Sequence, residues 1–168
     1  MFSVQIRFAE LEDVPALMDI YNDYVICSSA TFDITPKSIE ERTAWFHAHP
    51  RESRWKILTA LDSSGAAAGF TSSNPLRPKE AYNTSVETTI YVAREKRHLG
   101  IGRKLYARLF EELQKEDVHR AYACIALPNP ASISLHESFG FTPVGVFHEA
   151  GRKFGRYISI QWMEKILN

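Results

Sequence analysis

The sequence is poor in cysteine and in long apolar runs. Its two cysteines, Cys27 and Cys124, are far apart and form no Cys-X-X-Cys pair. We expect them to be free thiols in a reducing compartment. No apolar run approaches the length of a membrane span, and residues 1–14 hold no basic segment followed by an apolar one. The sequence therefore predicts a soluble, cytoplasmic protein.

The sequence also lacks net charge. Lys plus Arg and Asp plus Glu both number 20 among the 168 residues, which argues against nucleic acid or a membrane surface as the main partner. No spacing of His and Cys indicates a metal site. Hydrophobic residues make up 45% and charged residues 24%, the balance of a globular chain that can fill a core. The length fits a single domain over residues 1–168.

Apolar periodicity predicts alternating strands and helices. Helices are expected at residues 11–25, 35–49, from about 102 to 113, and at 129–141. Strands are expected at residues 3–10, 54–62, 66–73, 85–93 and 119–127, and as a pair around a Gly-rich turn at 142–166. Thr35 and Asn129 are the expected N-caps, each followed by a proline. The order β-α-α-β-β-β-α-β-α-β-β predicts a mixed sheet flanked by helices, an α/β or α+β layered domain.

A Gly-X-Gly turn, Gly100–Gly102, lies between a strand and a helix in the stretch EKRHLGIGRKLYARL. Such a turn directs backbone N–H groups at one spot, where the helix dipole favours an anionic phosphate. Arg97, Arg103 and Lys104 would strengthen that binding. Alone, the turn is equally compatible with a solvated loop. No Gly-Lys-Ser/Thr follows, as a Walker motif requires, and the missing third glycine speaks against a dinucleotide-binding module.

The order of motifs carries more information than the turn. From Arg97 the sequence is Arg-X-X-Gly-X-Gly, between VETTIYV and a helix, and Asn129 later opens a short helix that ends in FGF. This order resembles the GNAT superfamily of acetyl-CoA-dependent N-acetyltransferases. IALPNPASISLHESFGF, GVFHEAGRKFGRYISIQWME, and IYNDYV followed by ATFD resemble its phosphinothricin and methionine-sulfoximine N-acetyltransferase branch over nearly the whole chain. The resemblance implies a mostly antiparallel sheet, acetyl-CoA as cosubstrate without a metal, and a homodimer.

The resemblance also implies an acetyl-CoA site. In the family the glycine turn binds the pyrophosphate, the preceding strand binds the acetyl carbonyl and pantetheine through its backbone, and the Asn-started helix lies along the pantetheine. The implied cofactor residues are Tyr91, Val92, Arg97, His98, Leu99, Gly100, Ile101, Gly102, Arg103, Asn129 and Ser132. The N–H of Val92 would stabilise the oxyanion. Asn129 is also an ordinary helix cap before a proline.

In addition to the N–H of Val92, two side chains are catalytic candidates. Glu87 shares a strand face with Thr89 and Tyr91, and the residues alone favour a solvated carboxylate. The family places a glutamate here as the general base that takes a proton from an ammonium substrate. His136 shares a helix face with Asn129. The resemblance implies that His136 protonates the leaving thiolate, and simple packing between helix and sheet is the alternative.

The substrate side depends on the loop at residues 74–83. The resemblance implies that Arg77 and Lys79 recognise the carboxylate of an amino-acid-like substrate. Leu76 departs from the family, where tryptophan is frequent. The implied substrate-binding residues are Phe32, Arg77, Lys79, Tyr82 and Glu87. The predicted function is direct acetyl transfer to the α-amine of a small molecule of the phosphinothricin, methionine sulfoximine or methionine sulfone type. A protein or peptide N-acetyltransferase and a non-catalytic acyl-CoA sensor are the alternatives.

Overall fold

A computed structural model of the chain describes residues 4–168. One seven-stranded sheet runs through it in the order β1-β2-β3-β4-β5-β7-β6. The strands are β1 Gln5–Phe8, β2 Ile57–Leu61, β3 Ala67–Pro75, β4 Ser85–Val92, β5 Arg120–Ala126, β6 Thr142–Lys153 and β7 Arg156–Ile166. Only β4 and β5 pair in parallel, and the other neighbours are antiparallel. The predicted element order and the mostly antiparallel sheet are confirmed, and Ser3 of the first predicted strand lies outside the described residues.

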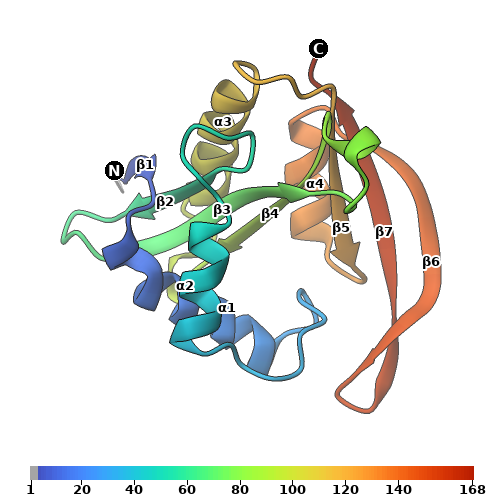
Figure 1. The fold of residues 1–168 in the computed structure, drawn as a ribbon. Coiled ribbons are helices and arrows are strands. Elements are labelled where there is room, and N and C mark those ends of the chain that lie inside the picture. The colour runs from blue at the N-terminus through green and yellow to red at the C-terminus, as the bar shows by residue number, and fades with distance from the viewer. Residues whose placement is uncertain (1–3) are drawn as a thin grey trace.

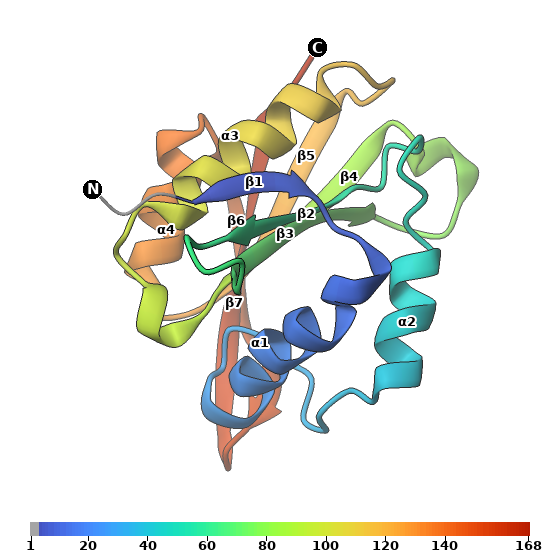
Figure 2. The same ribbon diagram turned by 90° about the vertical axis from the view of Figure 1, so that its left-hand side faces the viewer.

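Four α-helices cover the two faces of the sheet. They are α1 Val14–Cys27, α2 Ile39–His47, α3 Ile101–Leu113 and α4 Pro130–Ser138. Helices α1 and α2 lie on one face and α3 and α4 on the other, while β6 and β7 form a long hairpin at the edge (Figures 1 and 2). None of these helices, within residues 4–168, combines the length and apolar composition that a membrane span requires.

The second helix begins later than Thr35 and Pro36 predict. Helix α2 starts at Ile39, and the hydroxyl of Ser38 accepts a hydrogen bond from the N–H of Glu41 at 3.3 Å. The Glu41 carboxylate accepts in turn from the N–H of Ser38 at 2.8 Å. This reciprocal capping box satisfies two backbone donors at once, which a lone threonine cap would not do. The prediction of Thr35 as the N-cap was therefore wrong.

Hydrophobic packing fixes the position of the sheet from both sides. The apolar face of α3 is fully buried and packs against β2 and β4 through Leu58 and Val86. On the opposite face, Leu17 of α1 packs with Ile57 and Phe70. The buried α3 positions include Ile101, Leu105, Leu109 and Leu113, which are spaced four residues apart. Tyr91 of β4 packs against this second cluster. Because β4 is thus held from both faces, its backbone is a rigid support for side chains on either side.

The sheet opens between β4 and β5. Their parallel ladder pairs Ser85 with Arg120 and ends at Glu87 opposite Tyr122. Both strands continue beyond this point, β4 to Val92 and β5 to Ala126. Along residues 88–92, β4 therefore has no strand partner on its β5 side among the described residues. Backbone groups of this wedge that no strand bonds could bind an extended ligand, although those of Val92 contact Tyr24.

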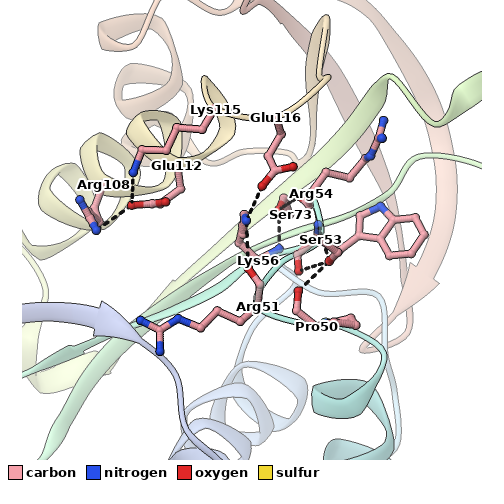
Figure 3. A network of polar contacts seen from close by, with 11 residues as sticks. Pro50, Arg51, Ser53, Arg54, Lys56, Ser73, Arg108, Glu112, Lys115 and Glu116 are labelled. Atoms are coloured by element: carbon pink, nitrogen blue, oxygen red, sulfur yellow. Dashed lines mark hydrogen bonds and ion pairs between the residues drawn. The ribbon is translucent and has the colours of Figure 1, made fainter.

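A polar network joins the β2–β3 pair to the end of α3, away from the wedge (Figure 3). The buried ammonium of Lys56 lies 2.6 Å from the Glu116 carboxylate and donates to the carbonyl of Arg51 at 3.0 Å. The backbone N–H of Lys56 donates to the hydroxyl of Ser73 at 2.8 Å. Such pairing offsets the cost of burying the charge, so we interpret the network as structural.

Candidate active site

A cavity of about 570 Å³ follows the opening between β4 and β5. We call it the wedge cavity; its walls are residues 88–92 of β4, residues 123–126 of β5 and the first turns of α3 and α4. The structure brings these predicted cofactor residues together on its lining: Tyr91, Val92, Arg97, His98, Gly100, Ile101, Gly102, Arg103, Asn129 and Ser132. Leu99, predicted with them, is 43% exposed and does not line the cavity.

The glycine turn forms one end of the wedge cavity. Gly100 is the N-cap of α3 with a φ of 76°, a left-handed conformation, and no side chain caps the helix. The first N–H groups of α3 are therefore available to an anion. A Cβ on Gly102 would lie 3.4 Å from Ile90 and from Leu135, so glycine allows β4, α3 and α4 to approach closely. With Arg97 on the same lining, the turn fits a pyrophosphate.

Tyr24 of α1 contacts Val92, at the end of β4. Its hydroxyl donates to the carbonyl of Val92 at 2.8 Å and accepts from the N–H of Val92 at 3.4 Å. The guanidinium of Arg97 lies 4.9 Å from the Tyr24 ring. The N–H predicted to be the oxyanion donor therefore makes only a long contact. Sequence reasoning missed Tyr24, although it lies three residues after Tyr21 on the inner face of the predicted helix.

His136 is buried in the wall of the wedge cavity. It is 2% exposed, and its Nδ1 lies 2.7 Å from the carbonyl of Ser132, so Nδ1–H donates there. Nε2 is then the acceptor for the hydroxyl of Tyr106 at 2.8 Å. Burial lowers the pKa of His136, which favours the neutral imidazole. The predicted cap is confirmed, since Asn129 Oδ1 accepts from the N–H of Ser132 at 3.2 Å.

Tyr106 is a second residue that sequence reasoning missed. It lies four residues after Gly102 on α3 and is fully buried. Its hydroxyl also contacts the hydroxyl of Thr88 on β4 at 3.3 Å. Helical periodicity was the available signal, because residues four apart share a helix face. Tyr106 connects the glycine turn, β4 and His136 of α4.

A second cavity of about 450 Å³ lies on the other face of β4. We call it the α2-side cavity; its lining residues are Tyr21, Asp33, Lys37, Glu41, Arg42, Trp45, Phe70, Ser72, Asn74, Glu87, Thr89 and Tyr91. Thr89 and Tyr91 also line the wedge cavity. The two cavities are therefore adjacent at β4.

Glu87 lies near this junction. Burial raises the pKa of its carboxyl, and the charge of Arg77 opposes that shift in part. Among residues 4–168 the carboxylate has no hydrogen-bond or ion-pair partner. Its charge helps to raise the pKa of Cys124 and Tyr106, which both line the wedge cavity. Glu87 is thus a partly buried, available carboxylate rather than a fully solvated one.

The other predicted substrate residues line neither cavity. The guanidinium of Arg77 lies 5.9 Å from the ring of Trp162, and its charge still reaches Glu87. Phe32 packs against Gly151 of β6, where a Cβ would overlap its ring. Tyr82 is exposed, and so is Lys79. Carboxylate recognition by Arg77 and Lys79 stays a prediction.

Comparison with known proteins agrees with this geometry. Residues 6–162 match the family model described as an acetyltransferase (GNAT) domain. The chain is 48% identical over 165 residues to the phosphinothricin N-acetyltransferase of Streptomyces coelicolor, across 98% of this chain and 96% of that protein. It is 36% identical to the L-methionine sulfoximine/L-methionine sulfone acetyltransferase of Pseudomonas paraeruginosa, across 96% of this chain and 94% of that protein.

A solved structure has the same fold. It is the GNAT superfamily phosphinothricin acetyltransferase of Sinorhizobium meliloti in complex with acetyl-CoA. It matches this chain with a TM-score of 0.94 and 30% identity, over 98% of this chain and 89% of that one. These similarities show that the chain belongs to the GNAT acetyltransferase family, as an N-acetyltransferase with phosphinothricin and methionine sulfoximine acetyltransferases among its relatives.

Proposed function

We propose that the chain transfers the acetyl group of acetyl-CoA directly to the α-amine of a small amino-acid-like acceptor of the phosphinothricin, methionine sulfoximine or methionine sulfone type. The main structural support for this proposal is that Thr89 and Tyr91 line both cavities. A donor in the wedge cavity and an acceptor in the α2-side cavity would meet at β4. The names of the relatives support the acceptor class.

The residues of the wedge cavity fit acetyl-CoA, which supplies the acetyl group as a thioester. The N–H groups at the start of α3, with Arg97 and Arg103, would hold the pyrophosphate. The unpaired backbone of residues 88–92 would hold the pantetheine arm. This arm would extend from the glycine turn toward the junction of the cavities.

Glu87 is the proposed general base. An amino-acid amine is protonated at neutral pH and must lose a proton before its nitrogen can attack a thioester. The raised pKa of Glu87 brings its basicity closer to neutrality, which improves proton transfer. The N–H of Val92 would then stabilise the oxyanion if it exchanged its long contact with Tyr24 for the acetyl oxygen. The role of His136 as the acid that protonates the departing thiolate stays a prediction, because Nδ1–H bonds the carbonyl of Ser132 and burial lowers the pKa of the ring.

The protonation state of Cys124 supports direct transfer of the acetyl group from acetyl-CoA to the amine. Its thiol lies on the wedge lining, where a covalent acetyl-enzyme could form only on a nucleophilic thiolate. Burial and the charge of Glu87 raise the pKa of this thiol to about 11, so it is protonated at neutral pH. We expect intersecting lines in two-substrate initial-velocity plots and unchanged turnover in Cys124→Ala. Parallel lines, with loss of turnover in that variant, would contradict direct transfer.

We also propose a homodimer that uses β6. This strand is at the edge of the sheet and is exposed along almost its whole length. Its exposed side chains include Val144, Val146 and Phe147. An open edge with apolar side chains is usually covered in a soluble protein. Light scattering should give the mass of two chains, and the mass of one chain at micromolar concentration would contradict the proposal.

A further inference from the structure

Arg42 of α2 is a buried cation without a polar partner. The side chain lines the α2-side cavity and is only 7% exposed. Its guanidinium lies 3.7 Å from the centroid of the Trp45 ring and 4.8 Å from that of Tyr21. The Nε and Nη2 atoms are buried without a hydrogen-bond partner, and Arg42 makes no ion pair within residues 4–168. Buried N–H groups are almost always bonded, so a guanidinium with two unbonded nitrogens is unusual. Those two atoms are closed to solvent, whereas Nη1 is not among them and can be reached from the cavity.

The other charges of the α2-side cavity have partners, apart from Glu87. Asp33 accepts from the hydroxyl of Tyr21 at 2.6 Å and lies 3.3 Å from the ammonium of Lys37. Glu41 belongs to the capping box at the start of α2. One unpartnered cation and one unpartnered carboxylate therefore remain in the same cavity. Such a pair is complementary to a ligand that carries an ammonium group and an anionic group.

The strand register indicates roughly how far apart the backbone positions that carry these two charges lie. The guanidinium of Arg42 lies 5.5 Å from the ring centroid of Phe70, and Phe70 pairs with Tyr91 across β3 and β4. Glu87 is four residues from Tyr91 on the same strand, about 13 Å along it. A hydrogen bond at each end takes about 3 Å of this span. A span of this order is compatible with an amino acid that has an extended polar side chain.

We propose that Arg42 binds the tetrahedral oxo group at the side-chain end of the acceptor, while the acceptor amine lies at Glu87. The inference rests on the proposed function for the identity of the acceptor. The accessible Nη1 can donate to an oxygen of such a group, and the contact is strongest when the group is anionic. Arg42 would therefore select a phosphinate side chain over a neutral sulfone. The α-carboxylate would remain for Arg77.

Binding without turnover tests this assignment. Phosphinothricin and methionine sulfone are titrated calorimetrically into the full chain saturated with coenzyme A, which carries no acetyl group to transfer. Arg42→Met keeps bulk against Trp45 but removes the charge, and Arg42→Lys keeps a charge without the planar guanidinium. Arg51→Met is the matched control, because Arg51 also stacks on an aromatic ring, at 4.4 Å from Phe8, but lines neither cavity. Coenzyme A affinity reports that each variant is folded.

We expect wild type to bind phosphinothricin more tightly than methionine sulfone. Arg42→Met should weaken phosphinothricin by about ten-fold or more, and methionine sulfone by clearly less. Arg42→Lys should lose an intermediate amount of phosphinothricin affinity, and it provides the comparison if Arg42→Met does not fold. Arg51→Met should leave both affinities unchanged. Equal losses for both ligands, no loss, or no binding to wild type would overturn the inference. Failure of the proposed function would appear differently, as binding without thiol release from acetyl-CoA.

Discussion

The hydroxyl of Tyr106 lies 2.8 Å from Nε2 of His136, and the carbonyl of Ser132 lies 2.7 Å from Nδ1. Both ring nitrogens are therefore occupied inside the wall of the wedge cavity. Burial holds the pKa of His136 below the ordinary value of about 6.5. The unfolded chain takes up this proton at a higher pH than the folded chain does, so stability is lost as the pH falls through about 6.5.

This linkage gives a measurable pH dependence. Between pH 7.5 and 5.5, we expect wild type to lose roughly 1 kcal/mol more unfolding free energy than His136→Gln, which cannot titrate. Urea unfolding at the two pH values measures the difference. The raised pKa of Glu87 acts with the opposite sign, but it is common to both proteins and is removed by the comparison. Equal pH dependence of the two proteins would show that His136 does not titrate abnormally.

Glu87→Gln should remove the base without changing the shape of the site. We expect turnover at neutral pH to fall by about 100-fold or more, because the acceptor amine keeps its proton. Affinity for acetyl-CoA, measured by calorimetry, should stay at the wild-type value. Glu52→Gln is the control, since Glu52 is exposed and lines neither cavity. Wild-type turnover in Glu87→Gln would remove Glu87 from the mechanism.

Gly100→Val should weaken acetyl-CoA binding through the backbone. A Cβ at Gly100 would meet no protein atom within 4 Å, but the φ of 76° is costly for a branched residue. Gly65 provides the control, because it has a φ of 84°, equally open space and a position in the β2–β3 turn. Both variants should lose about 1–2 kcal/mol of stability. Only Gly100→Val should bind acetyl-CoA more weakly. Equal weakening in Gly65→Val would contradict the assignment of the glycine turn to phosphate binding.

Gly151→Ala tests whether Phe32 takes part in acceptor binding. The added Cβ would overlap the Phe32 ring, which is partly exposed and can rotate away. We expect a higher KM for the acceptor, an unchanged KM for acetyl-CoA and little change in Tm. Gly145→Ala on the same strand is the control, since its Cβ would meet nothing within 4 Å. If the acceptor KM does not move, Phe32 is only a packing residue.

Local signals in the sequence were enough to predict the order of the helices and strands. They were also enough to predict the part of the wedge cavity formed by the glycine turn and the Asn129 cap. The glycine turn and the Asn129 cap depend on neighbouring residues, and both have their predicted conformations. The Thr35 cap failed because a better local alternative, Ser38 with Glu41, lies three residues further on. Competition between two local signals decided that boundary.

The contents of the cavities were harder to predict, because they depend on long-range pairing. The register of β4 against β5 opens the wedge after Glu87, and no local pattern encodes that end point. Tyr24 and Arg42 reach β4 or its cavities from helices far away in the sequence. Helical periodicity gives the face of each residue but not the strand that this face meets.

The most direct test is release of coenzyme A thiol from acetyl-CoA with wild type and Glu87→Gln. The acceptors would be phosphinothricin, methionine sulfoximine, methionine sulfone, the common amino acids, polyamines and a peptide panel. We predict turnover on the three amino-acid analogues that is largely lost in Glu87→Gln. Turnover confined to peptides or polyamines, or no turnover while acetyl-CoA binds, would contradict the proposed function.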